Sequence, residues 1–305
     1  MAAVHTVALA GATGNLGPSI LKELLGAGFK VKVLTRQGSQ SASSLPTQEG
    51  LSVKEVDYAS PDTLASALGG IDAVVSAFAS RSVAEQKTLI EAAVSAGVRR
   101  FVPSEFGCDT VNPNNAKLPV YGAKVMVQQL LKEKAASNPG FSYTLLMNNA
   151  FWDWGVNTGL VLNVKEHTAI LVNGGNTPIS VTRMSTIGKA IVGVLKNLEA
   201  TSNRAVYVHD AVVTQQQLID IVKKVDGKDW STTSVNTDEL TKESYEELKR
   251  ENPNVMKAML GFIRQAIWGK ENGGDFRGKA DNQLLGVPEL SQTEVEQVMH
   301  EIVKG

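Results

Sequence analysis

The stretch Gly11-Ala12-Thr13-Gly14-Asn15-Leu16-Gly17 decides the fold. It follows a short apolar run, residues 5–10, and opens a segment in which leucine and isoleucine recur at helical spacing. In such a turn the first glycine permits a tight bend, the second lets backbone N–H groups approach a pyrophosphate, and the third lets helix and strand pack closely. The helix N-terminus adds a positive field. The turn therefore predicts a nucleotide-binding unit, with contacts from Gly11, Thr13, Gly14, Asn15, Leu16 and Gly17.

Beyond this turn, the first third of the chain alternates apolar runs with helical patterns. Strands are expected at 31–34, 53–56, 73–77 and 99–103, and one helix begins at Pro61 with Ser60 as its N-cap. Repeated strand–helix units with apolar strands indicate an α/β fold, here a Rossmann doubly wound parallel sheet. Because ligands bind at the carboxyl ends of such strands, we expect one crevice, lined by residues 11–17, 35–37, 57–58, 76–81 and 103–107.

After residue 120 the pattern becomes mostly helical. A helix is expected at 121–134, a sixth strand at 142–147, and a later strand at 205–209. We expect an NAD(P)-binding Rossmann domain over residues 1–150 and a smaller, mostly C-terminal α+β substrate-binding region over residues 151–305. Within that region, residues 185–210 are expected to pack back on the first domain.

Composition excludes several classes of protein. The 305 residues include 30 Lys+Arg and 31 Asp+Glu, a net charge of −1, which argues against a nucleic-acid binder. The single cysteine, Cys108, excludes an intrachain disulfide, and the four histidines share no metal-ligand spacing, so no metal site is expected. No signal peptide and no run of bilayer length are evident. We expect a cytoplasmic protein with no membrane contact.

The strand that ends at Leu34-Thr35-Arg36 bears on the choice of nucleotide. It carries no acidic residue where NAD-preferring sites bind the ribose hydroxyls, and Arg36 can pair with a 2′-phosphate, which favours NADPH. The alternative is a solvated surface arginine. Asp57, after the third strand, can accept from the adenine amino group or can cap the helical region at Ser60.

A tyrosine–lysine pair is the usual acid–base pair of short-chain dehydrogenases. The literal match, Tyr245 and Lys249, lies in a charged helix and is interpreted as a chance match on a solvated face. Tyr121 and Lys124 are better placed, early in the helix after the fifth strand. Lys124 there can orient the nicotinamide ribose or transfer a proton, with Tyr121 as a second hydroxyl donor. The alternative is an exposed lysine on an amphipathic helix.

The run Phe151-Trp152-Asp153-Trp154 follows the sixth strand, where a substrate pocket opens in this fold. Flat aromatic walls suit a planar apolar ligand, although core packing explains the same residues. We expect Ser76 and Phe78 to contact the cofactor. The side chains expected to border the substrate are Phe106, Asn149, Phe151, Trp152 and Trp154.

These stretches together resemble the NmrA-like, isoflavone-reductase-like branch of atypical short-chain dehydrogenases. The resemblance rests on the GxxGxxG turn at 11–17, on Arg36, on the stretch RFVPSEFG at 100–107, and on Lys124 with the segments at 143–144 and 149–151. It implies an NADP-binding Rossmann domain, a catalytic lysine at Lys124, and reduction of phenolic substrates. The plant reductases carry an arginine and an acidic residue where this chain has Gln128 and Lys132, so the plant substrates do not carry over directly.

The favoured hypothesis is an NADPH-dependent reductase of a small carbonyl, enone or aromatic phenolic compound. A hydride would reach the substrate carbon, and Lys124 or a water held by it would supply the proton. The alternatives are a non-catalytic NADP-sensing regulator and a dehydratase or isomerase on the same scaffold. The expected partner is a small molecule, and the chain is expected to be a monomer or a homodimer.

Overall fold

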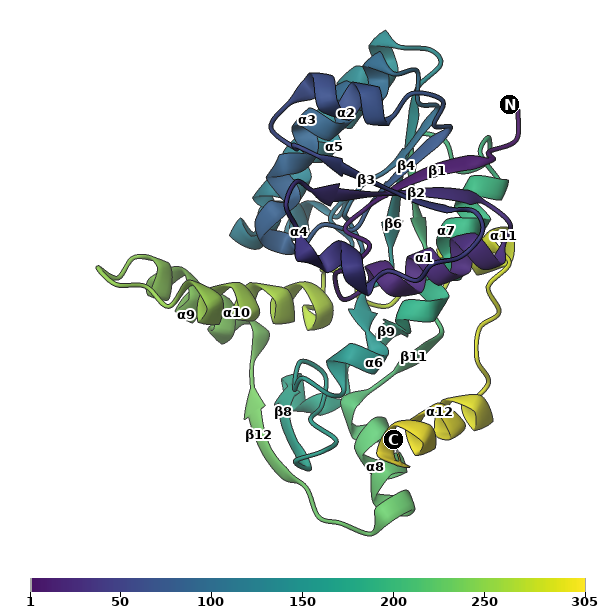
Figure 1. Ribbon diagram of the computed structural model, residues 1–305. Helices are drawn as coiled ribbons and strands as arrows, with labels where there is room; N and C mark the ends of the chain where they lie inside the picture. The colour runs from purple at the N-terminus through teal and green to yellow at the C-terminus, as the bar shows by residue number, and fades with distance from the viewer. Residues whose placement is uncertain (1, 305) are drawn as a thin grey trace.

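The computed structural model describes residues 2–304, apart from the side chains of residues 41 and 42. Its larger part is a seven-stranded sheet with the order β10-β6-β5-β4-β1-β2-β3 (Figure 1). Every pair of neighbours is parallel, which confirms the predicted Rossmann-like α/β class. The strands are β1 Thr6–Ala10, β2 Lys30–Arg36, β3 Leu51–Val56, β4 Ala73–Ser76, β5 Arg100–Val102, β6 Ser142–Met147 and β10 Arg204–Tyr207.

Helices cover both faces of this sheet. One face carries α1 (Gly17–Gly26), α7 (Met184–Lys196) and the short α11 (Asn282–Leu285), and the other carries α2 (Pro61–Ala67), α3 (Gln86–Ser95) and α5 (Gly122–Ser137) (Figure 1). Helices α1 and α7 pack closely. A Cβ at Gly188 would lie only 2.8 Å from the Ser19 carbonyl oxygen, so this contact leaves no room for a side chain there. The chain order reverses between β1 and β4, which is the ligand-binding switch point of such sheets.

A second lobe lies at one edge of the sheet (Figure 1). Its three-stranded sheet has the order β11-β9-β7, and two further strands, β12 and β8, pair in parallel. Their bounds are β7 Ala150–Phe151, β8 Thr168–Val172, β9 Ile179–Thr182, β11 Ala211–Val213 and β12 Ser231–Val235. Helices α6 (Trp152–Gly155), α8 (Gln215–Asp226) and α12 (Gln292–Lys304) complete this lobe, which has its own apolar core.

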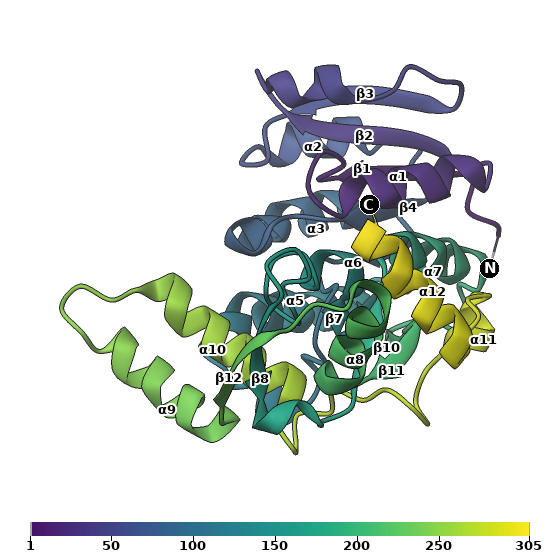
Figure 2. The same ribbon diagram turned by 90° about the horizontal axis from the view of Figure 1, so that it is seen from below.

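Helices α9 (Thr237–Leu248) and α10 (Val255–Trp268) form a hairpin that stands out from the body in both views (Figures 1 and 2). The remaining short elements are α4 Pro113–Ala116 and the 3₁₀ turns η1 Gln40–Ser44, η2 Ser80–Glu85, η3 Pro119–Tyr121 and η4 Asn173–Gly175. No helix within residues 2–304 is both long and apolar enough to cross a bilayer.

The strand expected at 205–209 corresponds to β10, which pairs with β6 in the large sheet. The expectation of a mostly helical chain after residue 120 is wrong for five short strands of the second lobe. These strands escape a sequence pattern because they are two to five residues long and, in β12, mostly polar and exposed. Residues 269–281, here called the strap, run from α10 toward α11.

Candidate functional site

The glycine turn closes tightly against the end of β4. Gly11 has φ +86°, and a Cβ there would lie 2.5 Å from the Ala77 carbonyl oxygen. A Cβ at Gly17 would lie 2.2 Å from the Gly11 carbonyl oxygen, whereas at Gly14 the nearest atom would be 3.4 Å away. Close packing therefore requires glycine at positions 11 and 17. Gly14 leaves its backbone uncovered at the opening of the turn, as the first turn of a dinucleotide-binding fold requires.

Ser104 joins the ends of β4 and β5 beside this turn. Its hydroxyl donates to the Ser76 carbonyl at 2.9 Å and accepts from the Phe78 N–H at 2.8 Å. The Ser76 hydroxyl is fully buried and lies 3.0 Å from the Ser104 hydroxyl, so it faces Ser104 rather than the crevice. The Phe78 ring is half-buried and packs edge-on against Tyr58, with ring centroids 5.0 Å apart. Sequence reasoning missed Ser104, although it lies within the quoted stretch 100–107.

Arg36 ends β2 and reaches across to the η2 turn. Its guanidinium lies 2.9 Å from the Glu85 carboxylate and donates to the Ser82 hydroxyl at 3.1 Å, while 58% of the side chain stays exposed. It is thus a paired but accessible cation at the carboxyl edge of the sheet. Asp57 accepts from the Ala59 N–H at 2.9 Å within its own turn, whereas Ser60 accepts from Thr63 and caps α2.

Lys124 lies in the first turn of α5 and is half-buried. Its ammonium donates to the backbone carbonyl of Glu105, in the loop that follows β5. The Glu105 side chain is 2% exposed, and its carboxylate accepts from Thr110 at 2.7 Å and from Gln128 at 2.9 Å. The expected lysine therefore does reach the carboxyl edge of the sheet. Glu105 was not singled out from sequence, although a charged residue among apolar ones is the signal that marks it.

Tyr121 is not placed as an open proton donor, which corrects the sequence expectation. It is 5% exposed, and its ring belongs to the apolar core of the second lobe, 5.6 Å from the Lys124 Nζ. Burial raises the pKa of Tyr121 well above its ordinary value, and Tyr121 shares this apolar core with Cys108. Burial likewise raises the pKa of the Cys108 thiol. Tyr121 and Cys108 are thus packing partners behind the lysine.

Two residues expected to border the substrate are structural instead. Trp152 is completely buried, and its indole N–H donates to the Met299 sulfur at 3.3 Å, so it is a core residue. Asn149 is 3% exposed, and its amide donates to the carbonyls of Ser180, at 3.0 Å, and Gly274, at 2.8 Å. Asn149 therefore ties β9 to the strap.

The other aromatic residues of the prediction remain accessible. Phe106 and Phe151 are half-buried and pack against the core beneath α1 and α7, as does Met184, which sequence reasoning did not single out. Trp154 is exposed. These four side chains thus keep part of their surface accessible.

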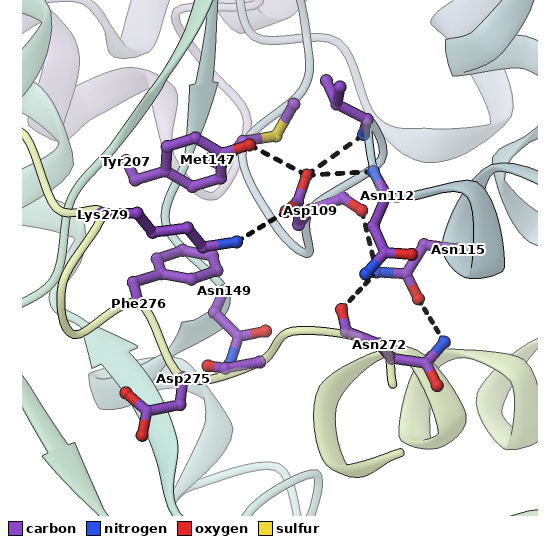
Figure 3. A network of polar contacts seen from close by, with 12 residues as sticks. Asp109, Asn112, Asn115, Met147, Asn149, Tyr207, Asn272, Asp275, Phe276 and Lys279 are labelled. Atoms are coloured by element: carbon purple, nitrogen blue, oxygen red, sulfur yellow. Dashed lines mark hydrogen bonds and ion pairs between the residues drawn. The ribbon is translucent and has the colours of Figure 1, made fainter. Parts of the chain in front are cut away.

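A polar network joins the loop after β5 to β10 and to the strap (Figure 3). The Asp109 carboxylate lies 2.7 Å from the Lys279 Nζ and accepts from the Tyr207 hydroxyl at 3.2 Å. The rings of Tyr207 and Phe276 contact each other edge-on, with centroids 5.2 Å apart, and the Lys279 Nζ lies 4.3 and 4.9 Å from the two centroids (Figure 3). The strap is thus joined to the loop after β5, although Asp109 and Lys279 are 170 residues apart in sequence.

Curated proteins with similar sequences include fungal and plant enzymes. The oxidoreductase aprR of Aspergillus flavus is 30% identical over 305 residues, covering 98% of this chain and 99% of that protein. Pinoresinol reductase 1 of Arabidopsis thaliana is 28% identical over 247 residues, covering 75% of this chain and 77% of that protein.

Solved structures share the fold at lower identity. One described as AtPrR2 with NADP+ and (+)pinoresinol has a TM-score of 0.74 at 23% identity, covering 100% of this chain and 99% of that chain. The leucoanthocyanidin reductase–NADPH complex from Vitis vinifera has a TM-score of 0.75 at 20% identity, covering 98% and 100%. The model of the NmrA-like family matches residues 4–263, which is most of the sequence. The chain belongs to the NmrA-like family.

Proposed function

We propose that this protein is an NADPH-dependent reductase of a small carbonyl, enone or aromatic phenolic compound, with Lys124 supplying the proton. The observation that carries the proposal is the position of Lys124, bound to the loop after β5 at the same sheet edge as the glycine turn. The similarity to proteins named as oxidoreductases and pinoresinol reductases supports the reaction class.

The glycine turn fits a dinucleotide. Glycine at 11 and 17 lets the turn pack tightly against its own backbone and that of Ala77, Gly14 leaves its backbone open, and the N-terminus of α1 directs N–H groups outward. Residues 11–17 would hold the pyrophosphate, Arg36 the 2′-phosphate, and Phe78 one wall of the site. When bound, NADPH supplies the hydride.

The chain's own residues then orient and protonate the substrate. The Glu105 carbonyl holds the Lys124 ammonium, which can donate directly or through a water. Phe106, Phe151 and Trp154 offer apolar surface on which a planar substrate can lie. Fixed positioning of the proton donor against this surface is what the reaction requires.

The test is oxidation of NADPH by the purified protein with a panel of quinones, enones, aryl ketones and phenolic ethers. We expect turnover with one class and a loss of kcat of about 100-fold or more in Lys124→Ala, a magnitude typical of a general acid. Lys132→Ala, an exposed lysine two turns later on α5, is the matched control and should change neither kcat nor KM. Tight NADPH binding without turnover would support a nucleotide sensor, and product formed without net NADPH oxidation would support an isomerase or dehydratase.

Cofactor choice is tested at Arg36. We expect Arg36→Ala to weaken binding of NADPH at least tenfold and of NADH little, because only NADPH carries the 2′-phosphate. Glu85→Gln should tighten NADPH a few-fold, since Glu85 competes with that phosphate for the same guanidinium. Fluorescence titration of both nucleotides measures this. Equal losses for NADPH and NADH in Arg36→Ala would contradict the contact.

Other expectations stay predictions. These are the division into a Rossmann domain over residues 1–150 and a substrate region over 151–305, the cytoplasmic location, and the monomeric or homodimeric state. Contact between Asp57 and the adenine amino group is also untested.

A further inference from the structure

Three buried side chains form a closed ring of hydrogen bonds behind Lys124. The Thr110 hydroxyl donates to one oxygen of the Glu105 carboxylate at 2.7 Å. The Gln128 amide donates to the other oxygen at 2.9 Å and to the Thr110 hydroxyl at 2.8 Å. Each side chain is no more than 5% exposed. Both amide hydrogens and the hydroxyl hydrogen are used, so the carboxylate of Glu105 has a single satisfied orientation.

The next two residues are fixed from the opposite side. The Gly107 carbonyl accepts from the N–H groups of Asn148, at 3.1 Å, and Asn149, at 2.8 Å, just beyond the end of β6. Between these two attachments Phe106 has φ +25°, which is a strained value for a bulky residue. Such strain persists only where the surroundings hold it, and it concentrates at functional positions. The segment 105–107 is therefore held rigidly between α5 and β6.

The position of the lysine depends on this segment. Lys124 and Gln128 are one helical turn apart on α5, so their side chains share a face. Gln128 binds the carboxylate of Glu105, and Lys124 binds the carbonyl of the same residue. Within residues 2–304 no carboxylate oxygen lies within 4.0 Å of the Lys124 Nζ. The backbone of Glu105 is thus the group that locates the ammonium.

We propose that Glu105 is the positioning residue of the site. Its carboxylate is fixed by Thr110 and Gln128, and this fixes the direction of its carbonyl, which holds Lys124. The same attachment holds the neighbouring residue, Phe106, in its strained conformation. That Lys124 then acts on a substrate rests on the proposed function, but its attachment to Glu105 does not.

The first experiment needs no substrate. Lysines are reductively methylated with ¹³C-formaldehyde, and the Lys124 resonance is identified by its loss in Lys124→Arg. We expect a separate resonance in the native chain that moves to the position of exposed lysines in Glu105→Gln. The double variant Glu105→Gln/Gln128→Glu exchanges carboxylate and amide within the ring and should restore the native resonance, as expected for coupled residues. Glu133→Gln, the same change at an exposed site on α5, is the control and should leave the resonance unmoved.

The second readout is turnover of whichever substrate the panel identifies. In Glu105→Gln we expect kcat to fall about 10- to 100-fold, because a misplaced donor loses alignment, with NADPH affinity unchanged. The double variant should recover to within about threefold of native kcat.

The outcomes distinguish the positioning role of Glu105 from the proposed reductase function. A native Lys124 resonance in Glu105→Gln overturns the positioning role, whether or not a substrate is found. Absence of turnover in the native chain would remove the proposed function and leave the resonance test standing. If Glu105→Gln does not fold, as judged by circular dichroism, Thr110→Val decides, since it removes one bond of the ring and keeps Glu105 and Gln128. A folded Thr110→Val with an unmoved resonance overturns the proposal, and a displaced resonance supports it.

Discussion

Two buried arginines show how differently one fold treats the same side chain. Arg100 is completely buried in β5 and donates to Ser142, Thr144 and Thr201 at 3.0, 2.7 and 2.8 Å and to the Leu198 carbonyl. Burial lowers its pKa to about 10. Arg264 on α10 is 8% exposed, burial lowers its pKa too, and its Nε has no partner within residues 2–304. Only Arg100 has its desolvation offset by hydrogen bonds.

Replacing each of these arginines by methionine should change the free energy of unfolding by different amounts. Arg100→Met leaves the Leu198 carbonyl and three hydroxyls without their donor, so we expect the free energy of unfolding to fall by about 2–4 kcal/mol. Arg264→Met removes a buried guanidinium whose Nε has no partner among residues 2–304, so we expect no loss or a gain of about 1 kcal/mol. Urea denaturation with the slope held constant measures both. Equal destabilisation would mean that the Arg264 stem contributes by packing.

At this scale sequence reasoning finds residues whose role follows from their position along a strand or helix. Lys124 was expected over the crevice because it lies early in the helix after the fifth strand, and its ammonium binds the loop after β5. The role of Trp152 was not predicted correctly, because its burial depends on Met299, 147 residues later. Glu105 and Gln128 were not paired for the same reason: their contact spans a loop and a helix turn that the sequence does not place.

At the scale of an element, Gly17 and Gly14 of the glycine turn differ in whether the folded protein has room for a side chain. A Cβ at Gly17 would overlap the backbone of residues 11 and 12, at 2.2 and 2.5 Å, so the first turn of α1 would have to move away from β1. A Cβ at Gly14 would meet its nearest atom at 3.4 Å, which the folded turn tolerates. Gly14 is thus free of packing demands from the protein itself.

We therefore expect Gly17→Ala to lower both the thermal midpoint and NADPH affinity, and Gly14→Ala to lower NADPH affinity alone. The loss of stability in Gly17→Ala should be about 2 kcal/mol or more, as for overpacked core positions. Differential scanning fluorimetry with and without NADPH measures both effects in one experiment. A Gly14→Ala protein with native NADPH affinity would show that the pyrophosphate lies elsewhere.

Most elements of the large sheet were predictable because β1, β4, β5 and β6 are almost completely buried, whereas β3 is mostly exposed. The sixth strand matches its expected bounds, 142–147, and Ser60 caps α2 as predicted. The strands of the second lobe were not predictable, since β7 has two residues and β12 is exposed along most of its length. Short strands of this kind form because partners far away in sequence pair with them.

For the whole molecule, segments from the second half of the chain support the large sheet and the loop after β5. Strand β10 completes the large sheet, α7 packs on α1, and the strap binds the loop after β5 through Lys279. The candidate site therefore combines residues from the first half of the chain with supports from the last fifth. The contact of the strap could not be inferred from a linear pattern, because Lys279 and its partner Asp109 are 170 residues apart in sequence.

Because β10 and the strap lie late in the sequence, they are synthesised after the strand and the loop that they contact. A ribosome releases a chain N-terminus first, at about 5–20 residues per second. Until residues 204–207 emerge, β6 is an open edge of the nascent sheet, and an unpaired edge is a template for association with another chain. The ion pair between Asp109, in the loop after β5, and Lys279 also cannot form until Lys279 has been synthesised. Nascent chains of this protein should therefore depend on chaperones longest over their first two thirds, and the site should become complete only when the strap has left the exit tunnel.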